Sequence, residues 1–114
     1  MADTLETSGL ANASVPAGAK AVVARLEAHR DELLALGVTS LTLFGSRARG
    51  DERKDSDLDL LIDYDRTRRF TLYDLVEVQR YLTELVGLEA HVATRNGFEP
   101  DRLDRLLKHS IIIF

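Results

Sequence analysis

The spacing of apolar residues divides the chain into helical and extended segments. Apolar residues three and four positions apart mark one face of a helix. This pattern predicts helices over residues 16–36, 72–86 and 100–108. Thr71, with Asp74 three residues later, resembles a capping box at the start of the second helix.

Three other segments are rich in β-branched or contiguous apolar residues, which is typical of strands. They span residues 38–44, 58–64 and 88–94. The second segment is too apolar for an exposed edge, so we expect it in the centre of a sheet. The four apolar residues at 111–114 are interpreted as a further short strand or an apolar chain end.

The order of these elements is helix, strand, strand, helix, strand, helix. With so few strands, we expect an α+β fold, with one small mixed β-sheet and helices packed mainly on one face. The other face is then left for a ligand or a partner. Residues 1–14 show no apolar period, so we expect a flexible N-terminal tail before a single domain over residues 15–114.

The charge balance limits the classes of partner. The chain has 19 acidic and 15 basic residues, for a net charge of −4, which argues against broad nucleic-acid binding. No apolar run approaches the roughly 18 residues of a membrane span. There is no cysteine, which is compatible with a reducing compartment, and the first residues lack the features of a secretory signal. We therefore expect a cytoplasmic protein that binds neither membranes nor nucleic acid directly.

The candidate chemistry lies between the first two predicted strands. Gly45 and Ser46 directly follow the first strand, where a glycine allows a tight turn and a hydroxyl beside backbone N–H groups suits a phosphate oxygen. Asp57 and Asp59 open the second strand two positions apart, so their carboxylates share one face. Two hard oxygen ligands suit Mg²⁺. The stretch predicts a phosphate cradle that faces a metal site, as nucleotide chemistry requires.

Two arginines extend this candidate site. Arg47 and Arg49 fall in residues 46–49, which we interpret as a short helical turn. A guanidinium matches phosphate geometry, but arginines in loops are also often simply solvated. For each of the two, phosphate binding and solvated loop charge therefore stay open. His29 and His109 are interpreted as surface residues.

The pattern G-S-x10-D-x-D, here Gly45-Ser46 through Asp57 and Asp59, resembles the signature of the DNA-polymerase-β-like nucleotidyltransferase superfamily. The strings FGSRARG and SDLDL resemble its minimal nucleotidyltransferase (MNT) branch. The resemblance implies the nucleotidyltransferase fold. It also implies that Gly45 and Ser46 hold the β- and γ-phosphates of ATP, and that Asp57 and Asp59 bind divalent ions, usually Mg²⁺. The reaction so implied is in-line displacement at the α-phosphorus with release of pyrophosphate.

One position departs from the superfamily pattern. Related proteins commonly carry a third carboxylate on the next strand, and His91 occupies that position here. Glu89 lies two residues earlier and shares its face. A histidine can act as a base near neutral pH, and it suits Mn²⁺ better than Mg²⁺. His91 is thus a candidate catalytic residue beside Asp57 and Asp59, with a purely structural role, or substitution by Glu89, left open.

The MNT branch further implies a partner. Such domains are often antitoxins paired with a HEPN-domain ribonuclease toxin, and they transfer AMP from ATP to a tyrosine of that toxin. We therefore predict a metal-dependent protein adenylyltransferase that acts as an antitoxin, as a homo-oligomer or in a hetero-oligomer with the toxin. The alternative is a nucleotidyltransferase-fold module that neutralises its partner by contact alone, which the missing third carboxylate favours. Transfer to a small molecule is less favoured, because such enzymes usually add a second domain for that substrate.

Overall fold

The computed structural model describes residues 15–114, so the predicted tail at 1–14 lies outside the described residues. A four-stranded sheet of order β3-β2-β1-β4 forms its centre. Its strands are β1 (Val38–Phe44), β2 (Leu58–Tyr64), β3 (Ala90–Thr94) and β4 (Ile111–Ile112). β1 runs antiparallel to both β2 and β4, whereas β2 and β3 are parallel. The sheet is mixed, as predicted.

β2 lies inside the sheet, between β1 and β3, which confirms the position predicted from its apolar run. Leu60 and Ile62 are buried on one face, and Leu61 is buried on the other, with 2% of its surface exposed. Because both faces are covered at this point, a strand without strict polar alternation is stable here.

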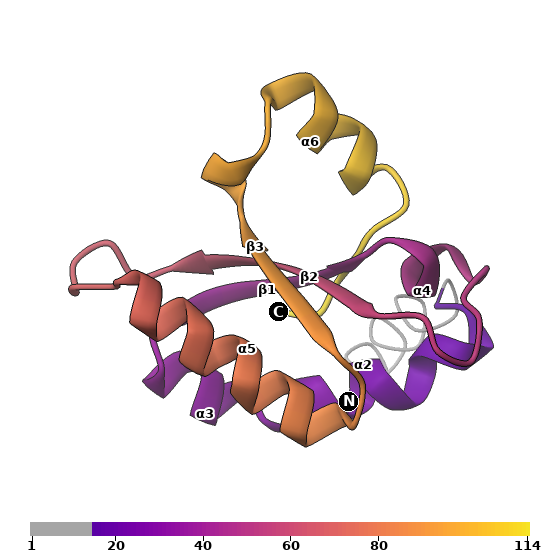
Figure 1. Cartoon of the computed structure of the whole chain (residues 1–114), viewed down its shortest axis with the longest axis horizontal. Coiled ribbons are helices and arrows are strands. Elements are labelled where there is room, and N and C mark those ends of the chain that lie inside the picture. Colours follow the sequence, from indigo (N-terminus) through magenta and orange to yellow (C-terminus); the bar gives the residue numbers. More distant parts are fainter. Residues whose placement is uncertain (1–14) are drawn as a thin grey trace, which may run out of the picture.

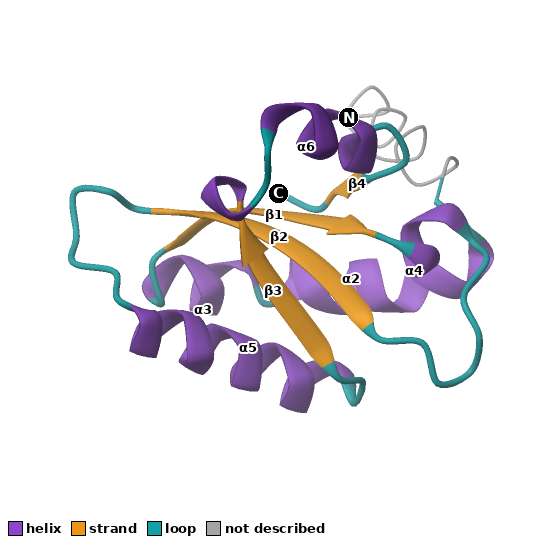
Figure 2. Ribbon diagram, turned by 45° about the horizontal axis from the view of Figure 1, so that its top comes forward, coloured by secondary structure: helices purple, strands orange, loops and turns teal. Residues whose placement is uncertain are grey.

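The helices are divided unequally between the two faces. Helices α2 (Lys20–Ala28), α3 (Arg30–Ala35) and α5 (Leu72–Val86) lie on one side of the sheet, and α6 (Pro100–Leu107) stands on the other (Figures 1 and 2). Three shorter segments are the 3₁₀ turns η1 (Ala17–Ala19) and η2 (Arg95–Gly97) and the single-turn helix α4 (Ser46–Arg49). This arrangement confirms the predicted α+β class.

The prediction of one helix over residues 16–36 is wrong, because His29 separates α2 from α3. Its backbone has φ −106° and ψ 22°, outside the helical region. The imidazole Nδ1 lies 2.8 Å from the carbonyl oxygen of Arg25, the acceptor that the His29 N–H would use in a continuous helix. That N–H donates instead to Leu26, at 3.2 Å. The side chain competes with the backbone and interrupts the helix.

Other boundaries agree closely with the prediction. The capping box of α5 forms, because the Asp74 carboxylate accepts hydrogen bonds from the Thr71 N–H at 2.6 Å and the Thr71 hydroxyl at 3.0 Å. β3 begins two residues later than predicted, and β4 is a two-residue strand at the start of the segment 111–114. Among residues 15–114, no helix has both the length and the apolar character needed to cross a membrane.

Candidate active site

The sheet topology brings the ends of three strands together. β1 ends where β2 and β3 begin, because β1 is antiparallel to β2 and β2 is parallel to β3 (Figure 2). The register pairs Phe44 with Asp59 and Asp59 with His91. Gly45, which follows Phe44, therefore lies beside Asp59, and segments far apart in the sequence meet at one edge of the sheet.

Gly45 makes the turn from β1 into α4. Its φ of +78° and ψ of −158° are accessible to glycine and to few other residues. Its carbonyl oxygen accepts hydrogen bonds from Ala48 and Arg49, each at 3.1 Å, so Ser46 becomes the first residue of α4. The predicted helical turn thus exists, and it begins directly after Gly45, which lies against the Asp59 carboxylate.

Three side chains at this edge converge closely enough to share a metal ion. The candidate ligand atoms of Asp57, Glu89 and His91 all lie within 4.8 Å of one another, and all three residues are exposed. His91 Nε2 is 2.9 Å from Asp57 Oδ2, so these two predicted catalytic residues touch. Asp59, the other predicted metal ligand, lies next to this group but outside it, and Glu89 takes the third place.

Asp59 sits in a more enclosed position than Asp57. Burial raises the pKa of Asp59 above its ordinary value of 3.8; His91 and Arg49 act against this rise, and Asp57 adds to it. A carboxylate that is costly to ionise alone gains most from a nearby cation. Asp57 and Glu89 offer oxygen ligands of the kind that Mg²⁺ prefers, and His91 offers a nitrogen ligand that suits Mn²⁺. These three residues form a possible metal site, with Asp59 beside it.

The two candidate arginines occupy different environments. Arg47 is 8% exposed, and its Nε and Nη2 donate to the Ser56 carbonyl at 3.1 and 2.7 Å. Ser56 directly precedes Asp57, so Arg47 holds the end of the loop that delivers that carboxylate. Arg49 is exposed, pairs with Asp51 at 3.2 Å, and acts electrostatically on Asp59. Of the two, Arg49 is the one that faces the site.

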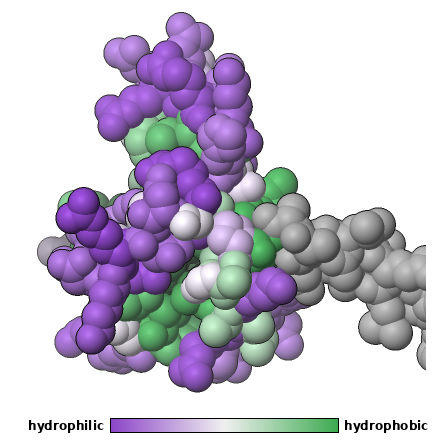
Figure 3. Space-filling view, turned by 90° about the vertical axis from the view of Figure 1, so that its right-hand side faces the viewer, coloured by the Kyte–Doolittle hydropathy of each residue, from purple (hydrophilic) through white to green (hydrophobic). Residues whose placement is uncertain are grey.

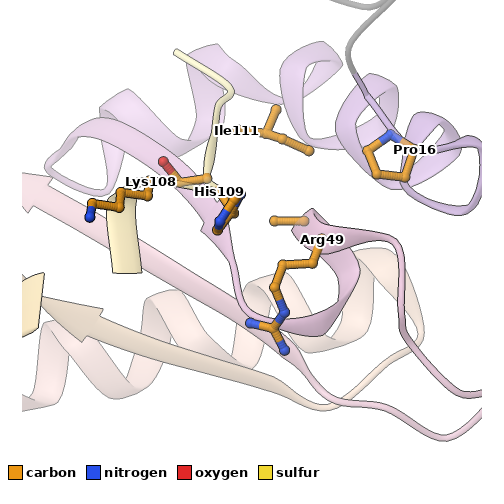
Figure 4. Close-up of a pocket in the computed structure, with 7 residues that line it drawn as sticks. Pro16, Arg49, Lys108, His109 and Ile111 are labelled. Atoms are coloured by element: carbon orange, nitrogen blue, oxygen red, sulfur yellow. The ribbon is translucent and has the colours of Figure 1, made fainter. Parts of the chain in front are cut away.

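A cavity of about 570 Å³ lies beside α4, and none of Asp57, Asp59, Glu89 and His91 lines it. Figure 4 shows side chains from α4 and from the turn between α6 and β4 around one space. Its walls include Pro16, Ala48, Arg49, Lys108, His109 and Ile111. In Figure 3, the part at the top of the molecule, where Figure 1 places α6, has a mainly hydrophilic surface. No local sequence pattern indicates this cavity, since its walls come from segments far apart in the chain. His109 is exposed, in agreement with its interpretation as a surface residue.

Comparisons with known proteins agree with this geometry. A family model described as nucleotidyltransferase domain matches residues 26–113. A relative assigned as a protein adenylyltransferase in Methanocaldococcus jannaschii is 35% identical over 79 residues, which cover 69% of this chain and 83% of the relative. A solved structure assigned as a minimal nucleotidyltransferase is 32% identical, with a TM-score of 0.62, and the match covers 78% of this chain and 93% of that one. A toxin–antitoxin crystal structure with AMP-PNP shares the fold, with a TM-score of 0.58 at 12% identity over 74% of this chain and 71% of that one.

Proposed function

The chain belongs to the nucleotidyltransferase domain family, and on that premise we propose that it transfers AMP from ATP to a tyrosine hydroxyl of a partner protein. The observation that carries the proposal is the convergence at one sheet edge. Gly45 lies against Asp59, and Asp57 lies 2.9 Å from His91. A phosphate turn beside a carboxylate group is the arrangement that nucleotidyl transfer needs.

In this proposal one set of residues binds the phosphates of ATP and another set binds the metal ion. Gly45 and Ser46 hold the β- and γ-phosphates, and Arg49 offsets part of their charge. Asp57 and Asp59, with Glu89 beside them, hold Mg²⁺ or Mn²⁺. When bound, the ion neutralises phosphate charge and favours in-line displacement at the α-phosphorus.

The transfer step balances without a further reactant. The acceptor oxygen forms a bond to the α-phosphorus of ATP, and the bond from that phosphorus to the bridging oxygen of the β-phosphate breaks, so pyrophosphate leaves. The hydroxyl proton passes to a base. His91 Nε2 lies 2.9 Å from Asp57 Oδ2, so in the neutral imidazole Nε2–H donates to that carboxylate and Nδ1 is left as the proton acceptor. His91 is therefore our first choice of base, with Glu89 as the alternative.

A protein acceptor is favoured by the openness of the site. Asp57, Glu89 and His91 are all exposed, so a side chain on a large partner can reach them. The M. jannaschii relative is assigned as a protein adenylyltransferase, and the toxin–antitoxin structure has the same fold. Together with the MNT motif, these observations support a HEPN toxin as the partner and an antitoxin role for this chain.

A second candidate function is neutralisation of the partner by contact alone. The specific observation in its favour is His91 at the position of the third carboxylate. The two candidates differ in what Asp57→Asn with Asp59→Asn does. If contact suffices, this double variant still protects cells from the toxin. Loss of protection with complex formation unchanged would rule the contact mechanism out.

The direct test is incubation with ATP labelled at the α-phosphate, Mg²⁺ and the product of the neighbouring gene. We expect label on a tyrosine of the partner, and we expect Asp57→Asn to abolish it. Asp55→Asn is the matched control, because Asp55 is an exposed carboxylate two residues away in the same loop. An unlabelled partner, or equal labelling by wild type and Asp57→Asn, would overturn the proposal.

A further inference from the structure

We propose that Lys108 and His109, in the turn between α6 and β4, form a second cationic wall of the nucleotide site and bind the terminal phosphates of ATP. This inference rests on the proposed function, since it concerns the same nucleotide. It adds two residues that lie about fifty positions beyond the motif. Their role is to bind substrate, and the chemistry remains with the carboxylates and His91.

The sheet register brings this turn to the phosphate cradle. β4 pairs with β1 through Thr42 with Ile112 and Leu43 with Ile111. The pairs end at Leu43 and Ile111. Gly45 follows Leu43 by two residues and His109 precedes Ile111 by two residues, so both lie just beyond the same end of this antiparallel ladder. The topology therefore sets the turn beside the glycine that begins the phosphate cradle.

The cavity at α4 shows that this proximity leaves room for a ligand. Arg49 from α4, and Lys108 and His109 from the turn before β4, line the same space of about 570 Å³ (Figure 4). Ligand sites are commonly about 300–1,000 Å³, so a polyphosphate group fits. Arg49 is therefore shared by the carboxylate group, through Asp59, and by this cavity.

The charge of the cavity wall is opposite to that of the chain. The net charge of −4 counts histidine as neutral, yet the cavity lining has two basic residues, Arg49 and Lys108, together with His109, and none of the lining residues is acidic. The β- and γ-phosphates carry most of the charge of ATP, and AMP lacks both. The Arg49–Asp51 pair is exposed and contributes little, so Arg49 can turn to a phosphate oxygen at small cost.

The turn that carries Lys108 and His109 is held in place by its own backbone. The Ser110 hydroxyl donates to the Leu107 carbonyl at 2.8 Å, and the Lys108 N–H donates to Arg105 at 3.4 Å. Pairing of Ile111 with β1 fixes the other end of the turn. Because the turn is anchored at both ends, its backbone loses little conformational entropy when Lys108 and His109 bind a ligand.

The test compares the binding of a non-hydrolysable ATP analogue with the binding of AMP, both in Mg²⁺, by calorimetry. For the double variant Lys108→Gln with His109→Gln, we expect the dissociation constant of the analogue to rise about tenfold or more and that of AMP to stay within about twofold. Lys108→Arg should retain tight binding of the analogue. Arg80→Gln is the matched control, because it removes one positive charge from exposed α5, across the sheet from α6.

A second measurement separates phosphate binding from a fold defect. Inorganic tripolyphosphate should displace the analogue from the wild type and from Arg80→Gln, and should bind the double variant about tenfold more weakly. Equal weakening of analogue and AMP, or no weakening of either, would overturn the inference. Failure of transfer to the partner in a protein that keeps this discrimination would contradict the proposed function and leave the phosphate wall in place.

Discussion

Gly45 lies so close to Asp59 that any side chain at position 45 would collide with the carboxylate. A Cβ built on Gly45 overlaps Asp59 Oδ2, and the glycine has φ +78°. The contact joins the turn proposed to hold phosphate to one of the carboxylates proposed to hold the metal. Glycine is therefore required at position 45 for two reasons: its positive φ, and the lack of space for a Cβ beside Asp59.

Gly45→Ala should therefore abolish transfer and lower stability. The backbone conformation alone costs an alanine about 1–3 kcal/mol, and displacement of the Asp59 carboxylate adds to that cost. Thermal unfolding and a transfer assay measure the two effects.

Two other glycines provide controls. Gly87→Ala meets the same positive φ, +79°, but no atom within 4 Å of the new Cβ, so it should lose stability and keep activity. Gly97→Ala meets no atom within 4 Å and should change neither property. Full activity of Gly45→Ala would show that the contact with Asp59 has no part in function.

Arg47→Met should loosen the loop that leads to Asp57. The Ser56 carbonyl loses both of its guanidinium donors, and a hydrogen bond to a charged group contributes about 1.5–3 kcal/mol. We expect a lower unfolding midpoint together with weaker Mg²⁺ or Mn²⁺ binding. Arg53→Met, in the same loop but exposed, is the control. Weaker ATP binding at unchanged stability would instead assign Arg47 to the phosphates.

His91→Asp restores a carboxylate at the position that the superfamily motif expects. Without metal it places a further negative charge beside Asp57 and Asp59, so the unfolding midpoint should fall; added Mg²⁺ should restore it. Transfer in Mg²⁺ should rise, because the new carboxylate adds a hard oxygen ligand, which Mg²⁺ prefers to an imidazole nitrogen. Slower transfer than wild type in both Mg²⁺ and Mn²⁺ would mean that His91 has a role a carboxylate cannot fill.

Asp74→Asn tests the capping box through its pH dependence. Hydrogen bonds from the Thr71 N–H and hydroxyl hold the pKa of Asp74 below its ordinary value of 3.8. A lowered pKa in the folded state means that the ionised carboxylate stabilises the fold at neutral pH, and that this contribution is lost as pH falls below about 4. Wild type should unfold at higher temperature than Asp74→Asn at pH 7, and the difference should shrink towards pH 3. A constant difference across that range would contradict the assignment.

Elements governed by local sequence were predicted best. β1, β2 and α5 have the predicted bounds, because an apolar pattern marks the strands and the Thr71–Asp74 box begins the helix. The Gly45 turn and the Asp57 strand start are also local, and the motif supplied both. The α+β class followed from the order of these elements.

Features made by distant or competing groups could not be predicted. The break at His29 depends on whether the imidazole or the backbone reaches the Arg25 carbonyl, which apolar spacing does not encode. The hydrogen bonds of Arg47 to Ser56 depend on the path of the loop between them. The pairing of β4 with β1 brings Lys108 and His109 to α4, and no local pattern in either segment indicates that encounter.

The most direct measurement is a crystal structure with a non-hydrolysable ATP analogue and Mn²⁺, with the metal located by its anomalous scattering. We expect manganese bound to the carboxylates of Asp57 and Asp59, and the β- and γ-phosphates on the backbone of Gly45 and Ser46. A triphosphate elsewhere on the chain, or a triphosphate at Gly45 with no manganese on the two carboxylates, would contradict the proposed site.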